Sequence, residues 1–195
     1  MVQEMRRRPL LLCVLLVLLA GPAALAPASA TAKANAGEQR NGTLEQGIQR
    51  EVNRIRVAHG LRALTLSTPL QASAMFQTRD MLEYGYFDHG QPGGASFSDR
   101  LKRFYPLNGS SAWLVGENLL WSSDGITPAA AVKLWLSSPP HRRNLFDPMW
   151  REFGIGAFNT AAPIGAFAEA NGPVVVVTMD FGSRSGSRTT AAVRR

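Results

Sequence analysis

The chain has 195 residues, a formal net charge of +7 and an apolar fraction of 45%, which fits one globular domain. Its single cysteine, Cys13, lies close to the N-terminus, so the rest of the chain has no thiol catalysis, disulfide framework or cysteine-ligated metal. The basic excess is concentrated at the two ends, without interleaved aromatic residues, which argues against nucleic-acid binding.

The N-terminal segment has the three parts of a signal peptide. A basic cluster, Arg6–Arg8, precedes an apolar run from Leu10 to Ala20, and Ala28-Ser29-Ala30 has the small residues of a cleavage site. The apolar run is short for a transmembrane span, and an uncleaved anchor is the alternative. We expect residues 1–30 to be removed near Ala30, which leaves a periplasmic or secreted protein. Its net charge falls to +5, because Glu4 leaves with three arginines.

Two polar segments are expected to flank the domain. Residues 31–40 are rich in Ala, Lys and Asn and predict a flexible leader. Residues 183–195 are rich in Ser, Arg and Thr and predict a basic disordered tail, in which we include Arg184, Arg188, Arg194 and Arg195. Such a tail could touch an anionic cell surface by charge attraction that fades with salt. The folded domain is therefore expected over residues 41–182.

The first predicted helix begins at Thr43, which with Gln46 fits a capping box. Gly60 is placed to end it. Apolar residues recur at helical spacing between these points, at Leu44, Ile48, Val52 and Ile55.

The second predicted helix has Thr68 as its cap, Pro69 at its first position and Gly85 at its end. Its expected apolar face consists of Ala72, Met75, Phe76 and Leu82.

The second half of the chain predicts shorter helices and then strands. Ser96 begins a short helix after a loop at Gly90–Gly94, and Thr127 caps another helix that Pro139-Pro140 ends. Ala129, Val132 and Leu136 are its expected buried face. Strands are predicted at Val115–Trp121, at Phe153–Ala157 and at Pro173–Phe181, the last buried on both faces. Helices followed by strands indicate an α+β fold, with helices packed on a small antiparallel sheet.

Three polar residues have unusual backbone settings. His89 opens a Gly-rich loop, Glu117 lies between Gly116 and Asn118, and His141 follows Pro139-Pro140. Two imidazoles and a carboxylate could bind a divalent metal such as zinc with open positions, or hold a proton near neutral pH. The alternative is a hydrogen-bonded packing role. His59, at the end of the first helix, is expected to be exposed.

An ordered set of motifs runs from about Asn41 to Gly182. It consists of Asn53 and Arg56 with Gly60-Leu61, then Phe87-Asp88-His89, Arg100, Gly116-Glu117-Asn118, the run Trp135-Leu136-Ser137-Ser138-Pro139-Pro140-His141-Arg142 with Asn144-Leu145, and Phe153-Gly154-Ile155-Gly156. This set resembles the superfamily of cysteine-rich secretory proteins, antigen 5 and pathogenesis-related 1 (the CAP superfamily, or SCP domain), in its bacterial, disulfide-free branch.

The resemblance implies an α–β–α sandwich with a cleft that in animal and plant relatives carries two histidines and two glutamates. His89, Glu117 and His141 match three of these residues, and by the resemblance Ser138 occupies the position of the second glutamate. The loss of one carboxylate weakens the expectation of tight metal binding, so no cofactor is required. Asn118, Asn144, Asn53 and Arg56 match family positions and are expected to support the structure.

Two functions from different classes remain open. The first is a binding module outside the cytoplasm, whose cleft of His89, Glu117, His141 and Ser138 holds a small ligand, a lipid or a cell-wall component, with or without a metal. The second is a hydrolase, in which Ser138 pairs with His141, or a metal on the histidines activates water. Ser138 lacks a nucleophile-elbow motif, so enzyme activity is the less favoured reading. A surface protein that binds partners without using these residues is a third reading.

Overall fold

The computed structural model of the protein describes residues 37–123, 125–170 and 172–187. The predicted signal peptide, most of the leader and residues 188–195 of the tail lie outside these ranges. Within them, no helix is long and apolar enough to cross a membrane. The helices are α1 (Gly42–Ala58), α2 (Thr68–Tyr84), α3 (Phe97–Phe104), α4 (Pro128–Ser137), α5 (Pro139–Phe146) and the short 3-10 segment η1 (Gly165–Phe167). The strands are β1 (Gln39–Arg40), β2 (Thr65–Leu66), β3 (Ser110–Ser123), β4 (Glu152–Thr160) and β5 (Val174–Ser187).

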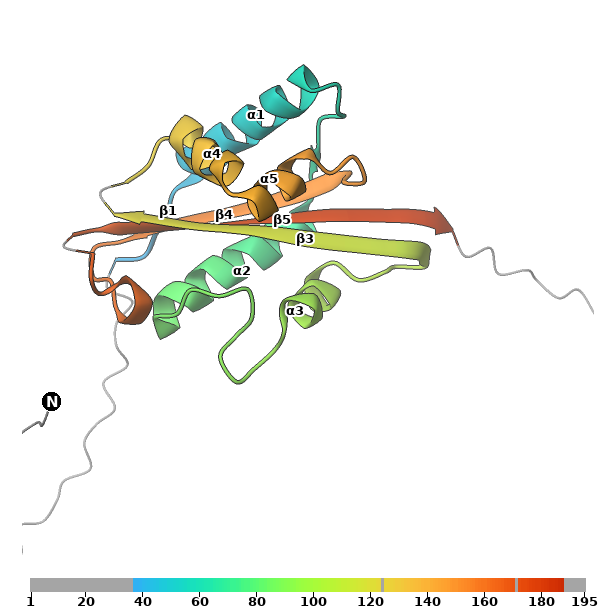
Figure 1. Ribbon diagram of the computed structural model, residues 1–195. Helices are drawn as coiled ribbons and strands as arrows, with labels where there is room; N and C mark the ends of the chain where they lie inside the picture. Colours follow the sequence, from blue (N-terminus) through green and yellow to red (C-terminus); the bar gives the residue numbers. More distant parts are fainter. Residues whose placement is uncertain (1–36, 124, 171, 188–195) are drawn as a thin grey trace, which may run out of the picture. The chain divides into compact units, whose positions relative to one another are not determined.

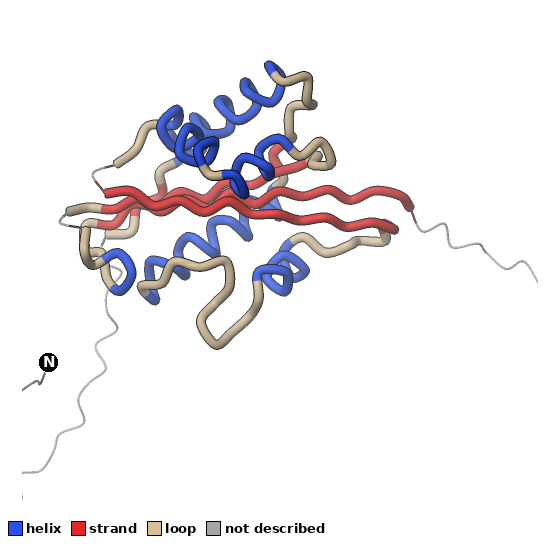
Figure 2. The backbone as a smooth tube through the Cα atoms, in the orientation of Figure 1, coloured by secondary structure: helices blue, strands red, loops and turns tan. Residues whose placement is uncertain are grey.

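The elements form three layers with the sheet in the middle. The strand order is β1-β4-β5-β3, and β2 pairs with β4 off this path. Only the short β2–β4 pair is parallel. Helices α1, α4 and α5 cover one face of the sheet, and α2 and α3 cover the other (Figures 1 and 2). The predicted α–β–α sandwich with a mainly antiparallel sheet is therefore confirmed.

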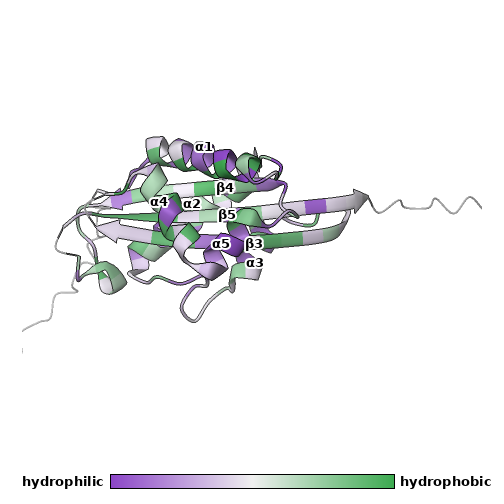
Figure 3. Cartoon of the chain, turned by 45° about the horizontal axis from the view of Figure 1, so that its top comes forward, coloured by the Kyte–Doolittle hydropathy of each residue, from purple (hydrophilic) through white to green (hydrophobic). Residues whose placement is uncertain are grey.

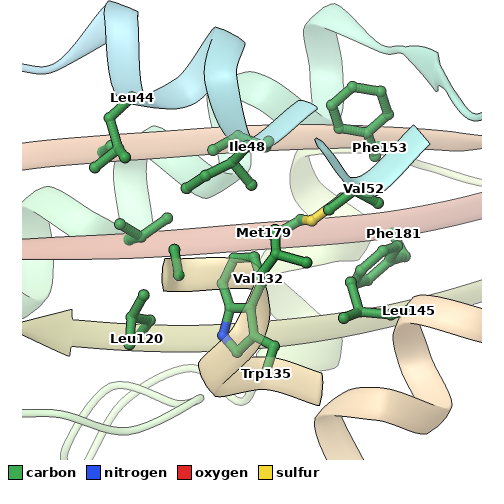
Figure 4. Packing of buried hydrophobic residues seen from close by; sticks show 14 of the residues in the cluster. Leu44, Ile48, Val52, Leu120, Val132, Trp135, Leu145, Phe153, Met179 and Phe181 are labelled. Atoms are coloured by element: carbon green, nitrogen blue, oxygen red, sulfur yellow. The ribbon is translucent and has the colours of Figure 1, made fainter. Parts of the chain in front are cut away.

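The larger hydrophobic core lies between the sheet and the layer of α1, α4 and α5. Figure 4 shows Trp135 of α4 and Ile48 of α1 directed toward Met179 of β5. A second cluster, which includes Met81 and Phe167, fills the opposite side. The central strand β5 supplies both clusters from alternate residues, so its Val174–Val177 run is buried on both faces, as predicted.

Helix α2 lies unusually close to β4 because two glycines face it. A Cβ atom at Gly154 would lie 2.1 Å from the backbone nitrogen of Gln71, and one at Gly156 would lie 2.6 Å from the Cα of Met75. The alternation of apolar residues and glycines in β4 therefore marks a helix contact on the glycine side rather than a solvent-facing side.

The two long helices begin differently from the sequence prediction. The cap of α1 is Asn41, whose side chain accepts a hydrogen bond of 3.0 Å from the backbone of Leu44, so the predicted capping box at Thr43 is wrong. The cap of α2 is Ser67 and not Thr68. The backbone N–H of Ser67 bonds to the carbonyl of Phe153, which holds Ser67 in an extended conformation until the helix begins.

The buried face of α2 is also rotated from the predicted one. Ala72 is exposed, Met75 and Phe76 are half-buried, and the buried face includes Ser73, Gln77 and Thr78. These polar side chains have partners inside the fold: the Thr78 hydroxyl, for example, donates to Oγ1 of Thr178 at 2.8 Å. The hydrogen bonds of these polar side chains thus fix which face of α2 is directed toward the sheet. In α4, similarly, Ala129 is exposed while Val132 and Trp135 are buried.

Both predicted domain boundaries are too narrow. Gln39 and Arg40 of the expected leader form β1, which pairs with β4. At the other end, β5 continues to Ser187 because its partner β3 extends equally far. Arg184, which is predicted to lie in the tail, has its guanidinium 3.9 Å from the centre of the Tyr105 ring. It therefore belongs to the fold and not to a free basic tail.

Candidate functional site

His89 and Glu117 come together at the edge of the sheet. His89 lies in the loop between α2 and α3, and Glu117 lies on the edge strand β3. The His89 Nδ1 atom is 2.7 Å from Oε1 of Glu117. The side chain of His89 is 52% exposed, whereas that of Glu117 is 1% exposed. A buried carboxylate thus anchors one nitrogen of a surface imidazole.

Arg100 of α3 is the buried hub behind this pair. One of its terminal nitrogens donates to the second carboxylate oxygen of Glu117. The other donates to the backbone carbonyl of His89 at 2.9 Å and to the side chain of Gln77. Its Nε atom bonds to the Ser73 hydroxyl at 3.3 Å. The rotated polar face of α2 therefore serves this arginine, which fixes both the loop and the carboxylate.

Asp180 on β5 adds a second carboxyl group to the cluster. It pairs across the strands with Glu117, it is fully buried, and its Oδ1 atom lies 3.5 Å from the guanidinium of Arg100. No hydrogen bond to either of its oxygens is found within the described residues. Burial raises the pKa of Asp180 well above its usual range, and the adjacent Glu117 carboxylate raises it further. A buried carboxyl group whose protonated form is favoured thus lies beside an anchoring carboxylate.

His141 approaches the same strand from the other helical layer. Its backbone carbonyl accepts a hydrogen bond of 3.1 Å from the Asn118 side chain. Asn144 donates to the carbonyl of Glu117 and to Oδ1 of Asn118, both at 2.9 Å. Alternate residues of a strand face opposite sides, so Glu117 faces α3 while Asn118 holds α5. Burial lowers the pKa of His141, and the proximity of the His89 ring lowers it further.

The chemical character of the two imidazoles therefore differs. The hydrogen bond to Glu117 raises the pKa of His89, although partial burial opposes this. Compared with a free imidazole, His89 thus favours its protonated form and His141 favours its neutral form. A cation and a neutral hydrogen-bonding ring together suit an anionic or strongly polar group better than a neutral apolar one.

Asn53 and Arg56 act further back, at the end of α1. The Asn53 amide and the backbone of Leu64 exchange two hydrogen bonds, of 2.8 and 3.0 Å. The buried guanidinium of Arg56 donates to the carbonyls of Leu145 and Asp147, at 2.7 and 3.1 Å. Arg56 thereby fastens α1 to the C-terminal end of α5, the helix that carries His141.

Ser138 does not join a catalytic arrangement. It lies at the junction of α4 and α5, where it is the N-terminal cap residue of α5 without a capping side-chain hydrogen bond. No bond between its hydroxyl and His141 is found in the described part of the chain. Moreover, Glu117 orients His89 and not His141. The pair of Ser138 and His141 considered from the sequence is therefore not hydrogen-bonded within the described residues.

The residues present do not fit a three-ligand metal centre. Both oxygens of Glu117 and the Nδ1 atom of His89 already have partners. Among the residues that the structure describes, no three His, Cys, Asp or Glu side chains are grouped so that they could hold a metal ion. Four of the cavities on the described surface, of about 300 to 440 Å³, are lined by residues other than His89, Glu117 and His141.

Sequence reasoning missed the buried half of this cluster. Asp180 follows a run of four valines in a strand expected to be buried on both faces, where an acidic residue is rare unless it is paired. That contrast was a usable signal. Ser73 and Gln77 were missed because the helix was read by its apolar residues alone. Arg100 belongs to the motif set, but neither its residue type nor its position in the sequence indicates that it binds Glu117.

The fold and the residue pattern agree with a known family. Residues 49–178 match the CAP family, described as the cysteine-rich secretory protein family, and the chain belongs to it. It is 33% identical over 112 residues to the uncharacterized protein YkwD of Bacillus subtilis (strain 168), a match that covers 57% of this chain and 41% of YkwD. The chain therefore spans less than half the length of that relative.

Two solved structures have the same fold. An extracellular protein of Bacillus anthracis str. Ames that contains an SCP domain is 26% identical, with a TM-score of 0.54 over 72% of this chain and 40% of that one. An outer surface protein of Borrelia burgdorferi is 18% identical, with a TM-score of 0.58 over 75% of this chain and 98% of that one. The second likeness concerns the fold alone.

Proposed function

We propose that the protein is an extracytoplasmic binding module, which holds a polar or anionic group of a small ligand, a lipid or a cell-wall component between His89 and His141. The observation that carries this proposal is the half-exposed imidazole of His89, held at Nδ1 by the buried Glu117 carboxylate. The SCP-domain protein of Bacillus anthracis str. Ames is an extracellular protein, which supports a location outside the cytoplasm for this chain.

The buried cluster gives this site its rigidity. Arg100 fixes the His89 loop through the backbone carbonyl, and Asn118 fixes the start of α5 through the carbonyl of His141. A binding group held in one orientation loses little conformational entropy when a ligand arrives. The second nitrogen of the His89 ring is directed away from Glu117 and is the group that we expect to contact the ligand.

Binding is tested with two probes that differ in their source. Calorimetry is carried out with a soluble disaccharide–peptide fragment of peptidoglycan and with phosphatidylglycerol vesicles. Whichever of the two probes the wild-type protein binds, we expect His89→Ala and His141→Ala each to weaken its binding at least tenfold. His59→Ala is the matched control, because His59 is exposed at the far end of α1. Equal binding by all three variants would refute the proposed site.

Ligand binding assisted by a metal ion at the two histidines would be a separate case. With Glu117 engaged by Arg100 and His89, only the two imidazoles remain as ligands, and two neutral ligands hold zinc weakly. We therefore expect no tight zinc binding by calorimetry. Tight binding that His89→Ala and His141→Ala both abolish would require Glu117 to leave Arg100, and would reopen a metal-dependent function.

The serine hydrolase alternative has no supporting contact in the described residues. Ser138→Ala is expected to leave ligand binding and any hydrolysis of ester substrates unchanged. A loss of hydrolysis confined to this variant would establish the serine mechanism after all.

A further inference from the structure

A cavity of about 300 Å³ lies at the outer edge of β4. In the strand order, β5 separates β4 from β3, which carries Glu117. The walls of the cavity come from both helical layers: α1 contributes Gln46 and Gln49, and α2 contributes Gln71. Figure 1 shows α1 and α2 on opposite faces of the sheet, so this cavity is at the rim between the layers. It is separate from the site around His89.

The edge of β4 is covered at both ends of this cavity. On the β2 side, the carbonyl of Phe153 accepts a hydrogen bond of 2.8 Å from the backbone of Ser67. On the β1 side, the carbonyl of Ala157 accepts one of 2.8 Å from the backbone of Asn41, and the N–H of Ala157 donates to Glu45 at 3.1 Å. Phe153 and Ala157 thus direct backbone groups away from β5, to the outer edge.

Ile155 lies midway between these two residues. In an antiparallel pair, alternate residues direct both backbone groups to the same side, so the N–H and C=O of Ile155 also face outward. No turn, loop or cap hydrogen bond to either group is found among the described residues. Ile155 is 2% exposed and lines the cavity. Because buried backbone groups are almost always hydrogen-bonded, the cavity has one donor and one acceptor ready for a partner.

The side chains around Ile155 have matching chemistry. Gln46, Gln49 and Gln71 each present an amide with donor and acceptor atoms, and none of these three amides has a side-chain hydrogen bond within the described residues. Arg40 and Glu45 also line the cavity but pair with each other at 2.7 Å. The available groups are therefore amides, and the best complement to a set of amides is another amide.

We propose that this cavity binds the backbone of a short extended peptide, which exchanges hydrogen bonds with the N–H and C=O of Ile155 and contacts the amides of Gln49 and Gln71. Addition of a peptide to a sheet edge is an established mode of recognition, in which main-chain bonds supply affinity. The open interval between Phe153 and Ala157 spans residues 154–156 of β4, which is roughly 10 Å at about 3.3 Å per residue. This length suits a segment of about three residues.

The test uses the isotopically labelled protein and N-acetyl-trialanine N-methylamide as the probe. We expect a saturable shift of the Ile155 amide resonance and slower exchange of its proton with solvent. An ester analogue that lacks the central N–H should bind about fivefold more weakly, the effect of one hydrogen bond. The double variant Gln49→Leu, Gln71→Leu should lose at least tenfold in affinity. Gln39→Leu, on exposed β1 and outside the cavity lining, is the matched control.

The outcomes separate this proposal from the one for His89. An unshifted Ile155 resonance at saturating probe, or unchanged affinity in the double variant with an unaltered melting temperature, would overturn the peptide site. A shift caused by N-acetylglucosamine and not by the peptide would assign a sugar amide instead, and would also overturn it. His89→Ala is expected to leave peptide affinity unchanged, so either site can fail without the other.

Discussion

Asp180 and Glu117 lie directly opposite each other in the β3–β5 pair, and both carboxyl groups approach the same buried guanidinium, that of Arg100. One cation faces two acids in a space closed to solvent. Burial and the neighbouring Glu117 raise the pKa of Asp180, which favours its protonated form and reduces this imbalance. The half-exposed His89 ring is connected to the interior through this arrangement.

Removal of Arg100 is expected to destabilise the fold strongly. Arg100→Leu leaves Glu117 buried without its cation and also frees the carbonyl of His89. Breaking a buried ion pair in this way costs about 3–5 kcal/mol, to be measured by urea unfolding. Arg50→Leu, on the exposed face of α1, should change stability by less than about 0.5 kcal/mol. A loss below about 1 kcal/mol in Arg100→Leu would contradict the role of the cluster.

Asp180→Asn should change the pH dependence of stability in a definite direction. Because the folded pKa of Asp180 is raised, the native state binds more protons than the unfolded state above about pH 4, so this residue makes stability fall as pH rises. Asparagine cannot ionise. The free energy of unfolding of Asp180→Asn, relative to that of the wild type, should therefore increase between pH 4 and pH 7. Urea unfolding of both proteins at each pH measures this difference. Parallel curves for the two proteins would show that Asp180 ionises normally.

The two site histidines are expected to titrate on opposite sides of the ordinary value. His89 has a raised pKa because of its bond to Glu117, and His141 has a lowered pKa because of burial. The stabilisation from protonated His89 is complete below its unfolded pKa of about 6.5 and disappears as pH rises through the folded value. NMR titration of the imidazole protons should show directly that the pKa of His89 is higher than that of His141. Glu117→Gln should lower the pKa of His89 toward 6.5, and an unchanged pKa would show that Glu117 is not the cause of the shift.

The glycine contact between β4 and α2 makes a steric prediction. A methyl group at Gly154 would meet the backbone of Leu70 and Gln71 at 2.1 Å, and a helix backbone cannot move aside as a flexible side chain can. Gly154→Ala should therefore cost at least about 3 kcal/mol, at the upper end for overpacking. Gly42→Ala is the control, because nothing lies within 4 Å of its Cβ position, and it should stabilise by about 0.4–1 kcal/mol. Melting temperatures of both variants provide the measurement.

The sequence predicted the layers of the fold better than the ends of its elements. Apolar spacing located α1, and the valine run located β5, because both patterns report burial directly. The predicted cap of α2 is one residue too late because the strand is extended by the hydrogen bond between Ser67 and Phe153, a partner 86 positions away. No local pattern contains that information.

The site divides in the same way. His89, Glu117 and His141 were selected from short motifs, and the structure brings His89 and Glu117 into contact while His141 approaches from the other layer. Asp180 could not be paired with Glu117 without the strand register. The buried polar face of α2 could not be predicted from the hydrophobic pattern, which reports only the burial of apolar residues. Ser73 and Gln77 are buried because they form hydrogen bonds with Arg100.

The amide and guanidinium anchors around the two histidines have a consequence for how the site responds to acid. The carbonyls of His89 and His141 are held by Arg100 and Asn118, and α5 is fastened by Arg56, groups that neither gain nor lose protons in the range where proteins remain folded. Only the His89 ring itself is held by a carboxylate. A change in pH would therefore alter the charge of the two imidazoles on a stationary backbone, so that ligand affinity would respond to pH without the opening of a loop.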